Sequence, residues 1–144
     1  MRSALLTLLL LAACGTVCFA QCDKKVTLTA SKTQHLDSGG ALKETADEKT
    51  VVEFNKSDIT VSITGDNGDN KMTGTVKTDT CAWKVPFKEG KTKLHISLKR
   101  DDGDSRDFDV TIEGKDGKIT LLAENKDQPD DRIRLEIEKF EEKN

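Results

Sequence analysis

The sequence has few of the side chains that catalysis usually requires. Its 144 residues include no tyrosine, one tryptophan, two histidines and four cysteines. An enzyme needs a positioned nucleophile, base or metal, and a lone imidazole without a carboxylate or a second ligand seldom catalyses. We expect His35 and His95 to be ordinary solvated residues, on the polar side of a strand or near a turn. The sequence therefore predicts a protein that is not an enzyme, with no catalytic residue, no cofactor and no metal ligand.

A strong excess of charge of one sign is also lacking. The chain carries 23 Lys and Arg against 26 Asp and Glu, a formal net charge of −3, which becomes −4 if Arg2 is removed with the leader described below. A mildly acidic surface argues against nonspecific binding to nucleic acid or anionic membranes, and it is compatible with a basic protein partner. The interleaved aromatic residues that bind single-stranded nucleic acid are missing as well. We therefore expect no nucleic-acid partner.

Long hydrophobic segments are absent outside the first 20 residues. There, a positive start precedes an apolar run over residues 4–13, which is too short to span a hydrocarbon layer of about 30 Å. The small residues that follow are typical of a secretory signal peptide cleaved between Ala20 and Gln21. We predict a signal peptide at 1–20, a single domain at 21–144, and a secreted or periplasmic location.

The four cysteines leave two alternatives for export. The stretch LAACGTVCFAQC (11–22) holds Cys14, Cys18 and Cys22, which on a helix would place three thiols on one face, close enough for a soft metal. Cleavage after residue 20 removes two of them, and Cys22 and Cys81 then form an even pair for which an oxidising compartment predicts a disulfide. The alternative is a membrane-anchored lipoprotein lipidated at Cys14, because LAAC is similar to the bacterial lipobox. That cleavage would leave an odd set of three thiols, which argues against it.

The mature chain shows no sustained helical period and instead alternates apolar and polar residues from Val26 onward. Each run ends in Gly, Asn or Asp, and Asp116-Gly117 is a strong hairpin signal. Eight to ten strands joined by short turns predict an all-β, antiparallel up-and-down meander closed into a barrel, because closure removes the edge strands. A β-sandwich is the alternative. Phe140 has the wrong parity for the last run, so we expect it to cap the barrel end or to mark a bulge.

Two segments give more specific expectations. The sequence DSGG (37–40) is expected to turn the chain, and Val52 and Phe54 are expected to face the interior. A later strand is expected to end at KEGK (88–91). The inward face of that strand would hold Cys81, Trp83, Val85 and Phe87.

These runs carry a resemblance to a known family. The segments concerned are VVEFNKSDITVSI (51–63), MTGTVKTDTCAWKV (72–85), DFDVTIEGKDGKITLLAE (107–124) and RIRLEIEKF (132–140). In their order and pattern the chain resembles the small secreted bacterial lipocalin-like (calycin) domains, although Lys25-Val26-Thr27 occupies the place of that family's early Gly-x-Trp. The resemblance implies a lipocalin-like barrel.

Five large side chains are the candidates for a ligand site. Phe54, Met72, Trp83, Phe87 and Phe108 would surround an apolar cavity, as in ligand-binding barrels of this size. The alternative is that Trp83 is a core anchor. Eight strands enclose room only for side chains or one small ligand, so we expect a largely filled interior with at most a small open-ended pocket. The sequence favours a monomeric, non-enzymatic, lipocalin-like binding protein for a small apolar ligand.

Acidic turns support a second class of function. Their oxygen-bearing residues are Asp66, Asp69, Asn70, Asp101, Asp102, Asp104, Asp127, Asp130 and Asp131. Calcium prefers such oxygens, but their spacing differs from that of the helix-flanked calcium loop. In addition, Lys71, Arg100 and Arg106 lie beside them as counter-ions. Both observations favour ordinary hairpin turns that contribute to solubility. One alternative function is a protein-binding module that would present these carboxylates to a basic protein, such as a barrel resembling the periplasmic inhibitors of lysozyme. Another alternative is a structural envelope protein.

Overall fold

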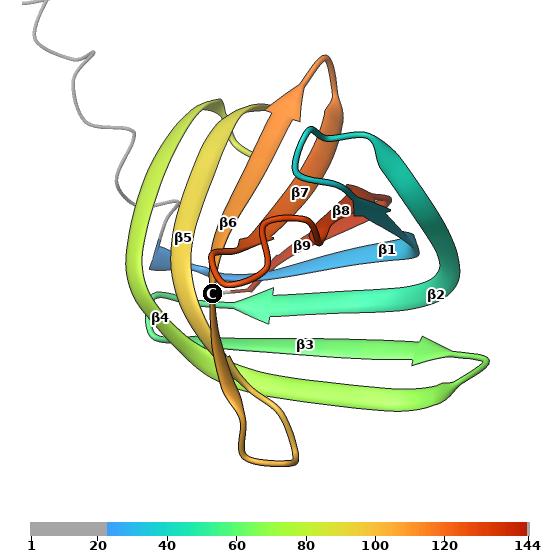
Figure 1. Ribbon diagram of the computed structural model, residues 1–144. Helices are drawn as coiled ribbons and strands as arrows, with labels where there is room; N and C mark the ends of the chain where they lie inside the picture. Colours follow the sequence, from blue (N-terminus) through green and yellow to red (C-terminus); the bar gives the residue numbers. More distant parts are fainter. Residues whose placement is uncertain (1–22, 144) are drawn as a thin grey trace, which may run out of the picture.

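The computed structural model describes residues 23–143, which form nine β-strands (Figure 1). Within these residues no helix is long and apolar enough to cross a membrane. The strands are β1 (Lys25–Leu36), β2 (Leu42–Phe54), β3 (Asp58–Gly65), β4 (Gly68–Val85), β5 (Glu89–Lys99), β6 (Ser105–Lys115), β7 (Lys118–Asn125), β8 (Arg132–Ile137) and β9 (Lys139–Lys143).

The strands close into one antiparallel barrel. Each strand from β2 to β8 pairs with the next strand in the chain, and β1 closes the sheet by pairing with β2 on one edge and with β8 and β9 on the other. Strands β8 and β9 lie end to end along β1, so they act as one strand of an eight-stranded barrel. The predicted up-and-down barrel is confirmed, and the β-sandwich alternative is wrong because β1 is paired on both edges.

The meander gives the barrel two distinct ends (Figure 1). The turns after β1, β3, β5 and β7 lie at one end, which we call the rim end. The turns after β2, β4 and β6 lie at the other, the base end, where the start of β1 also pairs with the end of β9. Residues that are close in sequence but on successive turns therefore belong to opposite ends.

Short sequence motifs specify several of the turns. Asp116 and Gly117 have φ of 53° and 76° and join β6 to β7 as a two-residue hairpin. This is the mirror-image turn whose twist matches the flanking strands, so the Asp-Gly prediction is confirmed. The DSGG turn is confirmed too, since β1 ends at Leu36 and β2 begins at Leu42 with Gly40 at a φ of 86°.

The base end is filled by a stack of aromatic rings. Phe87 lies between Trp83 and Phe140, with ring centroids 4.6 Å from the first and 3.9 Å from the second. The expectation that Phe87 continues the strand is wrong: β4 ends at Val85, and Phe87 occupies the turn with a φ of 50°. Burial of the ring in the barrel offsets this unfavourable backbone conformation. The turn covers residues 86–88, so it overlaps KEGK (88–91) only at Lys88.

Phe140 faces inward although its number is even, because the inward-facing residues change between odd and even numbers in two neighbouring strands. The inward residues of β1 are even-numbered up to Ala30 and odd-numbered from Thr33, while those along β8 and β9 are odd-numbered up to Ile137 and even-numbered at Phe140. Both strands shift at the same level, so the pairing register is the same on either side of Glu138. Phe140 thus both follows a strand irregularity and helps to close the base end, as the sequence led us to expect.

Candidate ligand-binding cavity

The barrel contains a cavity of about 140 Å³ in the half nearest the rim end. All eight barrel strands contribute to its wall, and most of the wall is aliphatic or aromatic. The lining side chains are Thr33, His35, Glu48, Thr50, Val52, Ile59, Val61, Ile63, Met72, Ile96, Leu98, Phe108, Val110, Leu121, Ala123, Ile133 and Leu135.

The burial of these side chains shows where the cavity opens. Ile96 and Leu121 deep in the barrel are buried, whereas Ile63, Met72 and Ile133 near the rim end are half-exposed. The aromatic stack fills the other end of the barrel. A ligand would therefore enter only past the rim turns, with its apolar part foremost.

The size of the cavity restricts what it can hold. Typical ligand pockets measure about 300–1,000 Å³, but an engineered apolar cavity of about 150 Å³ in another protein binds benzene. The 140 Å³ found here suits an apolar group of that size, such as one aromatic ring or a short alkyl chain. A fatty acid chain of ordinary length does not fit without movement of the wall.

The structure divides the five ligand-site candidates. Met72 and Phe108 line the cavity, whereas Phe54 and Phe87 border a separate gap of about 10 Å³ at the base end. Trp83 lies in the base core with 3% of its surface exposed, and its Nε1 donates a hydrogen bond to Oγ1 of Thr92 at 2.7 Å. The core-anchor alternative thus describes the position of Trp83. Met72 lies eleven residues before Trp83 on the same strand, and Trp83 is not among the side chains that line the cavity.

Of the cavity residues that the sequence prediction did not name, Glu48 is the one with a carboxylate. It follows the same even-numbered inward pattern as Thr50, Val52 and Phe54 in β2, and this parity was the available signal. Among residues 23–143, no side chain or backbone group forms a hydrogen bond or ion pair with its carboxylate. Gly65 lies opposite it in β3, so no side chain covers it from that strand.

The other polar groups of the wall are paired. Oγ1 of Thr33 and Oγ1 of Thr50 are 3.2 Å apart, which satisfies two buried hydroxyl groups. Nδ1 of His35 lies 3.1 Å from Oδ1 of Asp131 in the turn before β8. Glu48 is therefore the one charged group of the described cavity wall that is left to interact with a ligand.

The cavity adjoins a polar groove on the rim. This groove measures about 590 Å³ and shares His35 with the cavity wall. Its other lining residues are Lys43, Glu44, Asp127, Gln128, Pro129, Asp130 and Asp131. Nζ of Lys43 donates to the carbonyl oxygen of Asp130 at 3.1 Å, so this lysine is engaged with the protein backbone. The groove thus shares a wall residue with the apolar cavity, and its own lining is predominantly acidic.

The acidic turns identified in the sequence all lie at the rim end. They follow β3, β5 and β7, which end on the same side of the barrel. Over residues 37–41, 66–71, 100–106 and 126–132 there are nine Asp against five Lys and Arg, a net charge of −4. In the part of the chain that the structure describes, no three His, Cys, Asp or Glu side chains come together as a metal site. The tertiary structure thus gathers three separate clusters around one opening.

Both histidines differ from the solvated residues expected from the sequence. His35 and His95 are half-buried, and each is hydrogen-bonded to a carboxylate. Nδ1 of His95 lies 2.7 Å from Oδ1 of Asp109, and this bond, with help from Lys126, holds the pKa of Asp109 below its ordinary value despite the opposing effect of burial. The sequence could not indicate these pairs, because the partners are distant in the chain and meet only through strand pairing and turn placement.

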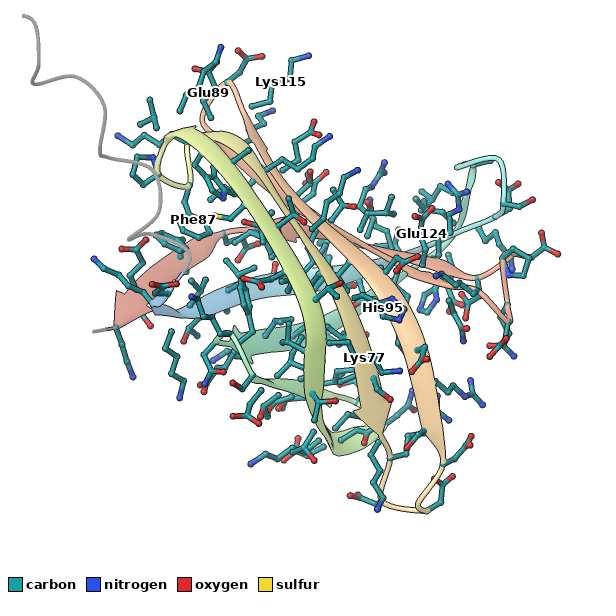
Figure 2. The ribbon with its side chains drawn as sticks, turned by 90° about the vertical axis from the view of Figure 1, so that its left-hand side faces the viewer. Lys77, Phe87, Glu89, His95, Lys115 and Glu124 are labelled. Carbon is teal, nitrogen blue, oxygen red and sulfur yellow. The ribbon has the colours of Figure 1, made fainter. Side chains whose placement is uncertain are left out.

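The His95 pair belongs to the outer wall of the barrel (Figure 2). On the same wall, Lys77 pairs with Asp107 and Lys91 with Glu113, each at 2.9 Å. These lysines donate hydrogen bonds that lower the pKa of both carboxyl groups. The outer wall is a ladder of cross-strand ion pairs, which set register and solubility rather than forming a site.

One predicted cysteine pair lies partly outside the described residues. Cys81 is half-buried in β4 against the core, but Cys22 precedes the described part of the chain, so the disulfide remains a prediction. The same holds for the signal peptide and for lipidation at Cys14.

The eight-stranded up-and-down barrel is consistent with a lipocalin-like fold. No family model, curated protein or solved structure was found to match this chain.

Proposed function

We propose that this chain is a non-enzymatic, exported binding protein that takes the apolar group of a small ligand into the rim end of its barrel. The observation that carries the proposal is the cavity of about 140 Å³, which has a predominantly apolar wall and is closed at the base. A tightly packed interior would have left no such space, since voids larger than a water molecule are few in protein cores.

The expected affinity follows from the size of the cavity. Burial of a phenyl-sized group contributes about 1.5–3 kcal/mol, which is less than the roughly 4.1 kcal/mol that corresponds to a Kd of about 1 mM. The apolar cavity alone would therefore bind only weakly. Useful affinity requires polar contacts at the rim in addition.

Filling the cavity tests the proposal. Ala123 lines the cavity, and Ala123→Leu should abolish binding of toluene, measured as loss of its chemical-shift perturbations of cavity methyl groups by NMR. Ala82 is exposed, so Ala82→Leu is the matched control and should bind as the unmodified protein does. Trp83 fluorescence is a poor reporter here, because the indole lies at the base end. Equal binding by both variants, or no binding by the unmodified protein, would refute the proposal.

A second candidate is supported by the charge of the rim. The net charge of −4 over the four rim turns suits a basic protein partner, as in barrels that inhibit lysozyme. Such recognition should weaken sharply as ionic strength rises, whereas burial of an apolar group should not. Inhibition of a basic lysozyme at low salt that disappears at about 0.3 M salt would favour this candidate, and no inhibition at either salt concentration would remove its support.

Export is part of the proposal and has its own test. Intact-mass analysis should find a mature chain that begins at Gln21, with a mass about 2 Da below that of the reduced chain if Cys22 and Cys81 are joined. A lipid-modified chain that begins at Cys14 and partitions into the membrane fraction would instead establish the lipoprotein alternative.

A further inference from the structure

We propose that the preferred ligand is a small primary amine that carries a compact apolar group, with its ammonium bound by the carboxylate of Glu48. This inference rests on the proposed function and names the chemistry of the ligand. It starts from the one carboxylate of the described cavity wall, which has no hydrogen-bond or ion-pair partner among residues 23–143 although most of the wall is apolar.

The position of Glu48 makes its carboxylate available to a ligand. It is half-buried on the inner face of β2, and its side chain runs beside Gly65, where an added methyl group would lie 3.1 Å from Cβ of Glu48. The missing side chain at this position leaves the space next to the carboxylate open. No hydrogen bond or ion pair reaches it from any described residue, so a bound ammonium would not have to displace a protein cation.

The remaining charges of the opening favour the same sign of ligand. His35 is the only basic side chain of the described cavity wall, and it already pairs with Asp131. In the adjoining groove, Lys43 donates to a backbone carbonyl while Glu44 and Asp127 add negative charge. The net negative charge of this opening would repel a carboxylate ligand and attract an ammonium.

The cavity volume limits the size of the ligand's apolar group. About 140 Å³ accommodates one phenyl ring, and the half-buried Glu48 carboxylate lies in the wall of the same cavity. A ring joined to an amine by a short linker therefore places both groups without opening the barrel. Long-chain amphiphiles exceed the volume.

A three-member ligand series separates charge from apolar burial. We choose 2-phenylethylamine, 2-phenylethanol and phenylacetate, which share the ring and differ in charge, and calorimetry or NMR titration at about pH 7 and about 20 mM salt measures each Kd. The amine should bind at least about tenfold more tightly than the alcohol, which corresponds to about 1.4 kcal/mol, and phenylacetate should bind more weakly than both. The preference should shrink at about 0.3 M salt.

Two variants on β2 test whether the preference for the amine comes from Glu48. Glu48→Gln should reduce the preference for the amine over the alcohol to less than about twofold while the alcohol still binds, which also shows that the variant is folded. Glu53 faces outward on the same strand and pairs with Lys25, so Glu53→Gln is the matched control and should keep the full preference.

The outcomes distinguish the two proposals. If the alcohol binds but the amine has no advantage, or if Glu48→Gln keeps the advantage, the assignment of an amine to Glu48 is wrong and apolar binding stands. If none of the three ligands binds, the proposed function fails as well.

Discussion

Phe87 has an unfavourable backbone conformation and occupies the central position in the aromatic stack. The effect of each feature on the free energy of unfolding can be measured with substitutions at this position. Its φ is 50°, and its ring is 6% exposed between Trp83 and Phe140. Loss of a buried phenyl ring costs about 3–5 kcal/mol, of which the two ring contacts account for roughly 1–3 kcal/mol. Phe87→Ala should therefore remove a large part of a total stability of about 5–15 kcal/mol.

The backbone conformation predicts a second, opposite effect. Glycine adopts positive φ without the steric cost of about 1–2 kcal/mol that other residues have, whereas in ordinary strand positions glycine is about 0.5–1 kcal/mol less stable than alanine. Phe87→Gly should thus be at least as stable as Phe87→Ala. At Val85, which is exposed at the end of the preceding strand, the usual order should hold, with Val85→Ala more stable than Val85→Gly.

Urea unfolding followed by far-UV circular dichroism measures these differences. With a slope of about 2 kcal/mol per molar urea, a loss of about 4 kcal/mol lowers the midpoint by about 2 M. Trp83 fluorescence serves as a second probe, and coincident transitions would support two-state analysis. A loss below about 1.5 kcal/mol for Phe87→Ala, or the same alanine-over-glycine order at both positions, would refute the reasoning.

Three further predictions concern single positions. Gly114→Ala should lower the free energy of unfolding by about 1–3 kcal/mol, because the new Cβ would lie 2.8 Å from the Trp83 ring; an unchanged urea midpoint would show that the ring has room to move. Gly117→Ala should cost about 1 kcal/mol in thermal unfolding because of its φ of 76°, whereas Gly117→Asn should cost less, and equal costs would contradict the turn assignment. The pKa of Asp109 is lowered by its hydrogen bond with His95. The bond therefore stabilises the folded state at pH values above the pKa of about 4 that Asp has in the unfolded chain. This stabilisation is lost as the pH falls through the lower pKa of Asp109 in the folded state. Asp109→Asn should therefore lose less than about 1 kcal/mol at about pH 5.5, where the carboxylate is ionised, and this loss should shrink below about pH 3; a constant difference across that range would exclude the pair as its cause.

Much of the fold was predictable because its signals are local. Alternation of apolar and polar residues defines strands whose faces are buried and exposed, and Asp116-Gly117 specifies its turn through backbone conformation alone. The place of Phe87 was not predictable from alternation. Its ring gains more from the stack with Phe140, which is distant in the chain, than the backbone loses in the turn.

The candidate site was predicted less well than the fold. Choosing large apolar residues identified Met72 and Phe108, but it also selected residues of the base core, since parity gives the face of a strand and not the level along the barrel. Glu48 shares the inward parity of β2, but only Val52 and Phe54 of that strand were predicted to face the interior, so Glu48 was not considered.

The sequence by itself determined the strands, most of their inward faces, most turns and the antiparallel meander, because these depend on side-chain period and on backbone preferences within a few residues. Only the tertiary structure decided that the barrel closes through β1, that its base is filled by rings while its rim half keeps a cavity, and that three acidic turns surround the opening. The physical reason is that closure, volume and the summed charge of an end depend on side chains from all the strands at once, and no local stretch of sequence contains that sum.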